Sequence, residues 1–574
     1  MDFSLAELAA LTGGRILGRA DSSVRASRVT TDSRGLRPGE AFLAIRGERF
    51  DGHDFACQAL ESGAVCVLLD APDLARTCAE QGPVILVQDT LQALIRLAEA
   101  SRLASAYRVV AVTGSVGKTS TRDMIYAGFC EALGTDSVLR TEANLNNIFG
   151  VAQTLLSLER GSGPRYLILE LGIDRPGEMD CLASMARPDV AVLTLIGASH
   201  LAQFGTRARL LEEKCRLLAY LRSGGLILYP CGDQDLAAEV QSFVDRRPEL
   251  ELSALALGLL ETGEASPDRV AGEQLLATHA GMNARQTWAQ LRLIEGTGSR
   301  RPASDPAGKQ TACGRHAESP AMRAPWRACK PGSGGLLSPD EQRAWRRTLD
   351  GQSLHLERSG AHFLWAALYA LGAASAWGLE AQAFFQGLGK YQETGRRQHR
   401  VDGDQLSLID DSYNASEESM LAAQAYLLRV AREERYRAVA ALASIRELGP
   451  SSAELHARLG RQLGRDPAEL YLLCGEDYPA LLRGLCSALT EQGRSWSCQR
   501  AEGPGQAPVD EFVGDPARPA VRIYCRAERE ALETLLPELL QPGDLLLVKG
   551  SNYYRMDKLG QRAWHLLNGE DQHL

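Results

Sequence analysis

The sequence lacks the features that indicate a zinc site, a redox centre or a nucleic-acid partner. None of its 13 cysteines forms a C-x-x-C pair, so neither zinc binding nor thioredoxin-type chemistry is indicated. An odd number of scattered cysteines in a long chain without an export signal is typical of a reducing cytosol. The net charge of −9 argues against nucleic-acid binding, because proteins that bind phosphate backbones usually carry a basic surface.

Signals for export and for membrane insertion are also lacking. The N-terminal stretch MDFSLAELAALTGGRILG carries acidic residues among its apolar ones and has no basic region at its start, unlike a signal peptide. No run approaches the roughly 18 consecutive apolar residues that a membrane-spanning helix needs. We therefore expect a cytoplasmic protein without a membrane span.

What the sequence does contain is short apolar runs that alternate with helical stretches. Its 574 residues, 45% hydrophobic and 24% charged, are enough for about two to four globular domains. The runs in the middle of the chain are almost wholly apolar, as expected for a parallel sheet covered by helices on both faces. We predict an α/β protein of three domains, residues 1–100, 101–395 and 396–574.

One stretch interrupts this alternation. Residues 296–340 are rich in Gly, Pro, Ala and Ser, and they contain seven Lys or Arg and three Asp or Glu residues. Such a composition cannot bury enough apolar surface to offset the entropy of ordering the chain. We predict a flexible surface insertion without a function of its own.

The segment TGSVGKTS, residues 113–120, lies between an apolar strand and an amphipathic helix. It departs from the usual P-loop, because the position five residues before Gly117 is Val112 and not glycine. The helix N-terminus still offers unpaired N–H groups to an anion. Lys118 can reach terminal phosphates and the Thr119 hydroxyl can ligate Mg²⁺. The combination favours a nucleotide site over the alternative, an ordinary glycine turn.

This loop resembles the shortened TGxxGKT/S loop of the Mur ligases, the ATP-dependent amide-forming enzymes of peptidoglycan synthesis. Further stretches carry the resemblance in the expected order. They are TDSRGLRPGEAFLAIRGERFDGHDF (31–55), NLNNIFGVAQTLL (144–156), IDDSYNASEESMLAA (409–423) and VKGS (548–551). Within the family, the match is to the member that joins D-alanyl-D-alanine to UDP-N-acetylmuramoyl-tripeptide. The resemblance implies a substrate domain, a central P-loop ATPase with a mostly parallel sheet, and a Rossmann-like third domain.

The resemblance also implies binding residues for each substrate. For ATP these are Thr113, Gly114, Ser115, Val116, Gly117, Lys118, Thr119 and Ser120, joined by Arg396, Asp411 and Asn414 from the third domain. For the UDP substrate they are Ser27, Asp32, Ser33, Arg34, Arg46, Asn144, Asn146 and Asn147. For the dipeptide they are Tyr413 and Lys549. We expect a monomer with these small-molecule substrates and no nucleic-acid partner.

Two Mg²⁺ ions are implied, with Thr119, Glu170, His200 and Lys214 as ligands. Glu170 ends the apolar run ILE at the carboxyl end of an expected strand, where open α/β sheets bind ligands. Lys214 lies on a predicted helix, where a lysine is normally a solvated charge. The resemblance implies instead that Lys214 is carbamylated and helps to hold the second Mg²⁺. Lys118, Lys214 and His200 are the implied catalytic residues.

Some positions depart from the family pattern. Phe363 and Ala366 replace two asparagines, the second of which normally contacts adenine, while Ala443 and Ser444 replace a Gly-Asp pair. We therefore predict reduced selectivity for adenine. Two alternatives stay open: a related ligase that uses another acceptor, and a catalytically silent protein that keeps the UDP-sugar pocket.

Overall fold

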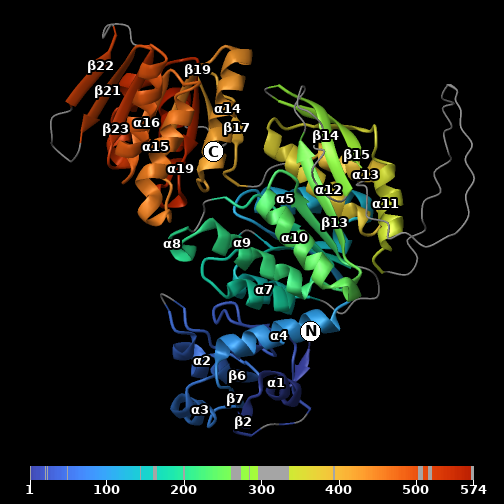
Figure 1. Ribbon diagram of the computed structural model, residues 1–574. Helices are drawn as coiled ribbons and strands as arrows, with labels where there is room; N and C mark the ends of the chain where they lie inside the picture. Colours follow the sequence, from blue (N-terminus) through green and yellow to red (C-terminus); the bar gives the residue numbers. More distant parts are fainter. Residues whose placement is uncertain are drawn as a thin grey trace, which may run out of the picture.

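The computed structural model has three α/β units that follow one another along the chain (Figure 1). It describes residues 2–19, 21, 23–47, 50–142, 144–158, 165–197, 201–259, 273–283, 285–294, 335–391, 395–501, 509–514 and 520–569. His200 and residues 296–334 of the expected insertion lie outside the described residues. The α/β class and the sequence of three units were both predicted, and both are confirmed.

The N-terminal unit contains a five-stranded sheet in the order β2-β7-β6-β5-β4, in which only β2 is antiparallel to its neighbour. The strands of this unit are β1 (Phe3–Ser4), β2 (Arg15–Leu17), β3 (Arg25–Ala26), β4 (Val29–Thr30), β5 (Ala41–Leu43), β6 (Cys66–Leu69) and β7 (Val84–Leu86). Its helices are α1 (Leu5–Thr12), α2 (Ala56–Glu61), α3 (Pro72–Cys78) and α4 (Thr90–Ala104). Helix α4 continues through residue 100, the expected domain boundary, and packs against the central unit (Figure 1).

A disulfide bond joins Cys57 on α2 to Cys78 on α3. The odd number of scattered cysteines is typical of a reducing cytosol and gives no indication of this pair. The two residues are 21 positions apart, yet the packing of α2 against α3 brings their Cα atoms to 5.2 Å. Nothing in their spacing indicates this contact, because it arises from the tertiary fold.

The central unit contains a nine-stranded sheet in the order β16-β15-β14-β13-β12-β11-β8-β10-β9. Its strands are β8 (Tyr107–Thr113), β9 (Val138–Arg140), β10 (Arg165–Glu170), β11 (Val190–Leu193), β12 (Leu226–Pro230), β13 (Ser253–Leu259), β14 (Glu273–Met282), β15 (Thr287–Ile294) and β16 (Ser353–Leu356). All pairings are parallel except those of β15 with β14 and β16, which confirms the predicted mostly parallel sheet.

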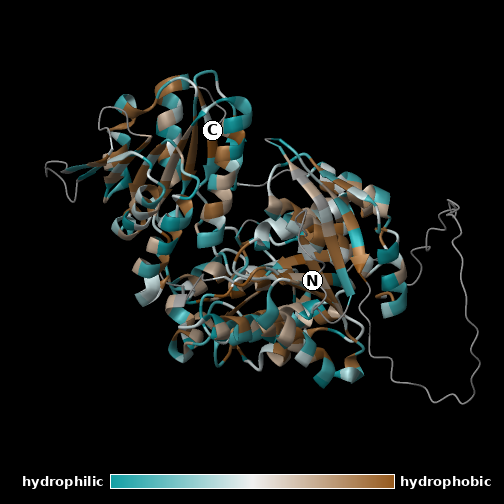
Figure 2. Ribbon diagram, turned by 45° about the horizontal axis from the view of Figure 1, so that its top comes forward, coloured by the Kyte–Doolittle hydropathy of each residue, from teal (hydrophilic) through white to brown (hydrophobic). Residues whose placement is uncertain are grey.

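Helices cover both faces of this sheet, as the apolar strands predict. Alternate residues of β8 show this directly, since Val109 and Ala111 pack into one core and Val110 and Val112 into the other. The helices are α5 (Lys118–Leu133), α6 (Ile148–Leu156), α7 (Glu178–Ala186), α8 (Leu201–Phe204), α9 (Arg207–Cys215), α10 (Gln234–Arg246), α11 (Pro339–Arg347), α12 (Ala361–Ser375) and α13 (Ala381–Gly389). In Figure 2 the strands of the sheets run as apolar ribbons between more polar helices.

The C-terminal unit contains an eight-stranded sheet in the order β17-β18-β24-β19-β20-β23-β21-β22, parallel inside and antiparallel at both edges. Its strands are β17 (His399–Val401), β18 (Leu406–Asp411), β19 (Arg437–Ala443), β20 (Leu470–Cys474), β21 (Trp496–Ala501), β22 (Val509–Val513), β23 (Val521–Arg526) and β24 (Asp544–Lys549). Its helices are α14 (Glu417–Glu434), α15 (Ser452–Leu463), α16 (Tyr478–Glu491), α17 (Arg529–Glu533), α18 (Leu536–Leu539) and α19 (Met556–Asn568).

The central unit contacts both of its neighbours near the carboxyl ends of its strands. The side chain of Gln153 on α6 donates a hydrogen bond of 2.7 Å to the Thr31 hydroxyl of the N-terminal unit. On the other side, the Ala202 N–H donates to the Glu447 carbonyl of the C-terminal unit at 3.1 Å. None of the helices in the described parts of the chain is long and apolar enough to cross a membrane.

Candidate active site

The loop between β8 and α5 is shaped by two glycines with positive φ angles, Gly114 (149°) and Gly117 (85°). A Cβ atom at Gly114 would lie 1.9 Å from the Thr194 hydroxyl, so only glycine fits there. The N–H groups of Ser115 and Val116 donate to the carbonyl of Leu195, at 2.8 and 3.3 Å, which fixes the loop to the end of β11.

The start of α5 has the properties of an anion-binding site. Its N-cap residue is Gly117, so no side chain covers the first N–H groups of the helix. The Ser115 hydroxyl is buried without a hydrogen-bond partner. Thr119, in the first turn of α5, is also buried. A phosphate group would satisfy these donors.

Two lysines converge on the carbonyl of Gly114. Lys118 Nζ donates to it at 2.9 Å and to the Ser115 carbonyl at 3.2 Å. Lys214 Nζ reaches the same carbonyl at 3.0 Å from α9, although the two residues are far apart in sequence. Two basic side chains from separate elements therefore meet at one carbonyl of the loop, at the place where the phosphates of a polyanion would be attracted.

Lys214 is 1% exposed, so it is not the solvated lysine that its helix alone would suggest. Burial lowers the pKa of Lys118 below its ordinary value. Burial, and next the positive charge of Lys118, lower the pKa of Lys214 well below its ordinary value. The neutral amine of Lys214 is therefore favoured far more than that of a surface lysine.

Glu170, 2% exposed at the end of β10, is the carboxylate of the site. Its Oε1 accepts a hydrogen bond of 2.8 Å from the Asn146 amide. Its Oε2 makes no hydrogen bond, and the guanidinium of Arg122 lies 3.3 Å away. In the part of the chain that the structure describes, no three His, Cys, Asp or Glu side chains gather as a metal site. The oxygen of Glu170 that makes no hydrogen bond and the Thr119 hydroxyl in the first turn of α5 are oxygen ligands of the kind that Mg²⁺ takes, usually with waters and phosphates as its other ligands.

The asparagines of the NLNN segment have structural partners. The side-chain amide of Asn146 donates to Glu170, and the main-chain carbonyl of Asn146 accepts a hydrogen bond of 2.8 Å from the Gly172 N–H. Asn147 caps α6, since its Oδ1 accepts from the Gly150 N–H at 2.9 Å. Asn144 is exposed in the loop before them. Contact of these residues with the UDP substrate stays a prediction.

The residues predicted to bind the UDP substrate from the N-terminal unit lie in three places. Asp32, Ser33 and Arg34 follow Thr31 in the loop that contacts α6, and Asp32 and Arg34 form an ion pair of 3.0 Å. Ser27 donates to the Gly39 carbonyl at 3.0 Å.

Arg46 belongs to a network that sequence reasoning missed. Its guanidinium lies 2.6 Å from Asp70 and 3.5 Å from Asp51, and the buried His53 bridges the same two carboxylates. Asp51 and His53 belong to the FDGHDF stretch, and Asp70 directly follows β6. The network fixes Arg46 at the base of its loop.

In the C-terminal unit, the predicted residues gather at the carboxyl ends of β18 and β24. Lys549 Nζ, almost fully buried, donates to Asp411 Oδ2 at 2.7 Å and to the Asn414 carbonyl at 3.1 Å. Burial raises the pKa of Asp411, against the opposing effect of the Lys549 charge. Lys549 therefore holds the edge of the sheet together, and its predicted contact with the dipeptide has to compete with these bonds.

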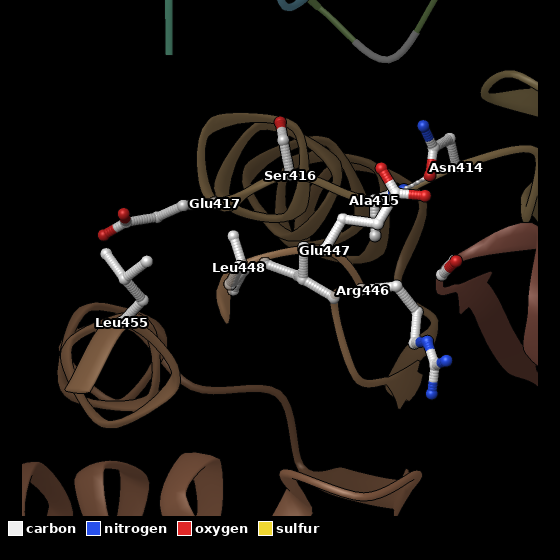
Figure 3. Close-up of a pocket in the computed structure, with 10 residues that line it drawn as sticks. Asn414, Ala415, Ser416, Glu417, Arg446, Glu447, Leu448 and Leu455 are labelled. Atoms are coloured by element: carbon white, nitrogen blue, oxygen red, sulfur yellow. Dashed lines mark hydrogen bonds between the residues drawn. The ribbon is translucent and has the colours of Figure 1, made fainter. Parts of the chain in front are cut away.

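A pocket of about 100 Å³ opens beside this edge (Figure 3). Its walls are the start of α14, the segment after β19, and Ser551. The residues that line it include Asn414, Ala415, Ser416, Glu417, Arg446, Glu447, Leu448 and Leu455. Acidic, basic and small apolar side chains therefore meet in one small space.

The positions that depart from the family pattern are buried. Phe363 and Ala366 pack in the core between α12 and the central sheet. Ala443 packs against Gly550 beneath the end of β19. Ser444 accepts from the Asp477 N–H at 3.0 Å and so fixes the loop before α16. These four residues stabilise their units, and none of them presents an amide or a carboxylate to a ligand.

The fold and the site together define a P-loop enzyme with a phosphate-binding loop, a metal-compatible carboxylate and a third unit that contacts the central one beside them. Protein-family models agree with this class. They are the Mur ligase family, catalytic domain, at residues 25–102, the Mur ligase middle domain at 112–247, and the Mur ligase, glutamate ligase domain, at 395–552, which together cover more than half of the chain. The chain belongs to the Mur ligase family of ATP-dependent ligases.

Individual proteins and solved structures of this family are similar to the chain over different parts of its length. The UDP-N-acetylmuramoyl-tripeptide--D-alanyl-D-alanine ligase of Bacillus subtilis is 40% identical over 215 residues, which cover 37% of this chain and 45% of the relative. The enzyme of the same name from Synechocystis is 28% identical over 92% of this chain and 90% of its own. Among solved structures, MurF from Acinetobacter baumannii matches with a TM-score of 0.71 and 23% identity, over 98% of this chain and 99% of that one. The MurF ligase of Thermotoga maritima in complex with ADP matches with a TM-score of 0.65 and 21% identity, over 94% and 97%.

Proposed function

We propose that the protein joins D-alanyl-D-alanine to UDP-N-acetylmuramoyl-tripeptide with hydrolysis of ATP to ADP and phosphate, giving UDP-N-acetylmuramoyl-pentapeptide. It would do so as a monomer in the cytoplasm. The observation that supports this best is the meeting of Lys118 and Lys214 on the Gly114 carbonyl, between the unit with the TDSR loop and the unit with the pocket of Figure 3. The relatives of this name that align over nearly the whole chain support the choice of substrates.

The chemistry requires activation of a carboxylate, which is a poor acyl donor at neutral pH. Transfer of the γ-phosphoryl group of ATP to the terminal carboxylate of the tripeptide gives an acyl phosphate and ADP. The neutral amine of the dipeptide then attacks the acyl carbon, the amide forms, phosphate leaves, and the amine loses a proton. During the first step Lys118 would stabilise the negative charge on the transferring phosphoryl oxygens.

Mg²⁺ would be held by Glu170 and Thr119 and, when bound, would neutralise charge on the phosphates of ATP. Carbamylated Lys214 would add a second anionic ligand from α9. CO₂ adds only to a neutral amine, and burial beside Lys118 favours that form of Lys214. A free ammonium at the same place would repel both the metal and Lys118.

The acyl phosphate hydrolyses readily, so the site has to exclude water. The C-terminal unit supplies a cover at two points. A Cβ atom at Gly197 would lie 2.6 Å from Glu418 on α14, and Gly449 packs against Ala202. The first contact places the start of α14 beside Gly197, two residues beyond the Leu195 carbonyl that holds Ser115 and Val116. Its pocket, with the charged side chains of Arg446 and Glu447, would receive the zwitterionic dipeptide.

One assay separates this function from its alternatives. Purified protein is supplied with ATP, Mg²⁺ and UDP-N-acetylmuramoyl-tripeptide, and phosphate release is measured with and without D-alanyl-D-alanine. We expect release only when both substrates are present. Release with another amino acid or peptide in place of the dipeptide would indicate a ligase with a different acceptor. Binding of the UDP substrate without any phosphate release would indicate a silent binding protein.

Selectivity for the nucleotide base should be lower than is normal for the family. Ala366 has no amide to read the adenine edge, and hydrogen-bonded selection is the strong kind because the wrong base leaves polar groups unpaired. Turnover is compared with ATP and GTP at equal concentrations, and the affinities of ADP and GDP are measured in parallel. A preference for ATP above about a thousandfold would show that another residue reads the base.

A further inference from the structure

Arg122, on helix α5 just after the phosphate-binding loop, is only 2% exposed, although an arginine usually keeps its charge in water. Its Nε donates a hydrogen bond of 2.7 Å to Asp123 Oδ1, and its Nη1 lies 3.3 Å from Glu170 Oε2. One guanidinium therefore bridges two carboxylates that are as deeply buried as it is. Removal of one member of such a group leaves an uncompensated buried charge, so each member strongly affects the others.

The fold directs this arginine at the end of β10. Thr119 and Arg122 are three residues apart on α5, so their side chains lie on one face of the helix, and α5 packs against β10. Glu170, the last residue of β10, pairs with Val112, which directly precedes the phosphate-binding loop. The helix face that carries the proposed Mg²⁺ ligand Thr119 thus also carries a cation that reaches the other proposed ligand, Glu170.

Asp123 is shared with a second arginine, from strand β9. Arg140 Nη1 donates to the same Asp123 Oδ1 at 2.8 Å, and the Arg140 guanidinium lies over the ring of Tyr126, with its Cζ 4.4 Å from the ring centroid. Within the described ranges, Arg122 is the one ion-pair partner of Glu170. The two arginines therefore share one carboxylate and differ in whether they reach the other.

The two oxygens of Glu170 have different surroundings. Oε1 accepts a hydrogen bond from the Asn146 amide, which fixes the orientation of the carboxylate. Oε2 faces the Arg122 guanidinium but makes no hydrogen bond. The charge on Oε2 is thus compensated by Arg122, while its lone pairs stay available to another ligand.

We propose that Arg122 is a positioning residue that makes Mg²⁺ binding at Glu170 depend on a bound nucleotide. This inference rests on the proposed ligase function, in which Glu170 is a ligand of Mg²⁺. Without nucleotide phosphates, the guanidinium compensates the Glu170 charge and repels a further cation at the same oxygen. The phosphates of ATP supply the additional negative charge that a dication beside Arg122 requires.

Arg122→Gln should bind Mn²⁺, a paramagnetic substitute for Mg²⁺, about tenfold or more tightly than the unaltered protein does without nucleotide, because a positive charge beside the ligand oxygen is removed. A merely structural role predicts the opposite, since a damaged site binds metal more weakly. Arg122→Lys keeps a cation on the same helix face and should stay closer to the unaltered protein. Titration with Mn²⁺ followed by electron paramagnetic resonance measures the affinity without substrates or turnover.

Arg140→Gln is the matched control, because it removes an arginine from the same Asp123 oxygen but not from Glu170, and it should leave the Mn²⁺ affinity unchanged. Combining Arg122→Gln with Glu170→Gln should abolish the gain, which would place the ion at that carboxylate. The proposal is overturned if Arg122→Gln binds Mn²⁺ more weakly than the unaltered protein or within about threefold of it, well short of the effect of a unit charge at this distance.

The unaltered protein provides a second test that does not require the variant to fold. Its Mn²⁺ affinity should rise by about tenfold or more when a non-hydrolysable ATP analogue is present, after subtraction of the Mn²⁺ bound by the analogue alone. Equal affinity with and without the analogue would also overturn the proposal. If the unaltered protein does not ligate, the proposed function fails, whereas the Mn²⁺ titrations still test Arg122.

Discussion

Lys118→Ala should abolish ligation while the affinity for UDP-N-acetylmuramoyl-tripeptide stays nearly unchanged. Lys118 Nζ lies at the phosphate-binding loop, bound to the carbonyls of Gly114 and Ser115, whereas the TDSR loop belongs to the N-terminal unit. Removal of a preorganised cation at the transferring phosphoryl group should lower turnover by about a thousandfold or more. Phosphate release gives the turnover, and calorimetric titration gives the affinity for the UDP substrate.

Lys390 provides the matched control for this variant. It is 67% exposed and forms an ion pair of 2.7 Å with Glu131 on the same helix α5 that Lys118 begins. Lys390→Ala should keep both turnover and affinity, because surface pairs contribute little. If Lys118→Ala loses affinity for the UDP substrate together with activity, the assignment of that substrate to the N-terminal unit is wrong.

Lys214→Ala should be nearly inactive, and short carboxylic acids in the buffer should restore part of the rate. The variant removes the amine on which the proposed carbamate forms, and an added carboxylate can occupy the vacated space as an anionic oxygen ligand. The expected loss is roughly a hundredfold or more, the size expected when a preorganised charge at a transferring phosphoryl group is lost. Turnover is measured with and without acetate, with Lys390→Ala as the control that acetate should not affect.

A second readout of Lys214 does not depend on activity. Protein equilibrated with ¹³C-labelled CO₂ should give a carbamate carbon signal in NMR spectra, and Lys214→Ala should lose that signal. Turnover of Lys214→Ala equal to that of the unaltered protein would show that no essential carbamate lies at this position.

The sequence predicts the architecture well because the strands carry a strong pattern. The apolar runs around Val110, Ile168 and Val192 can be buried only in a sheet covered on both faces, and the structure places all three there. The antiparallel end of the central sheet was not predicted. The alternation in TWAQLRLI, whose first residues are in turn buried and exposed, is the signal that would have indicated β15.

The sequence could not predict which side chains are in contact with one another. The helical pattern around Lys214 gives no sign that its Nζ turns inward to the Gly114 carbonyl, because that contact links residues from separate elements of the fold. Likewise, Arg396 pairs with Asp557 while its neighbour Arg397 lies over the ring of Tyr413, and the sequence around the two arginines indicates neither contact. Motifs predict which residues are candidates for the site, and tertiary packing decides which of their atoms meet.

The central claim, ligation through phosphorylation of the tripeptide carboxylate, is tested most directly by following oxygen. UDP-N-acetylmuramoyl-tripeptide labelled with ¹⁸O in its terminal carboxylate is incubated with the protein, ATP, Mg²⁺ and D-alanyl-D-alanine, and the released phosphate is analysed by mass spectrometry. We predict that one ¹⁸O atom passes from each reacting carboxylate into phosphate as the pentapeptide forms. Phosphate without the label, or label in AMP, would contradict the account.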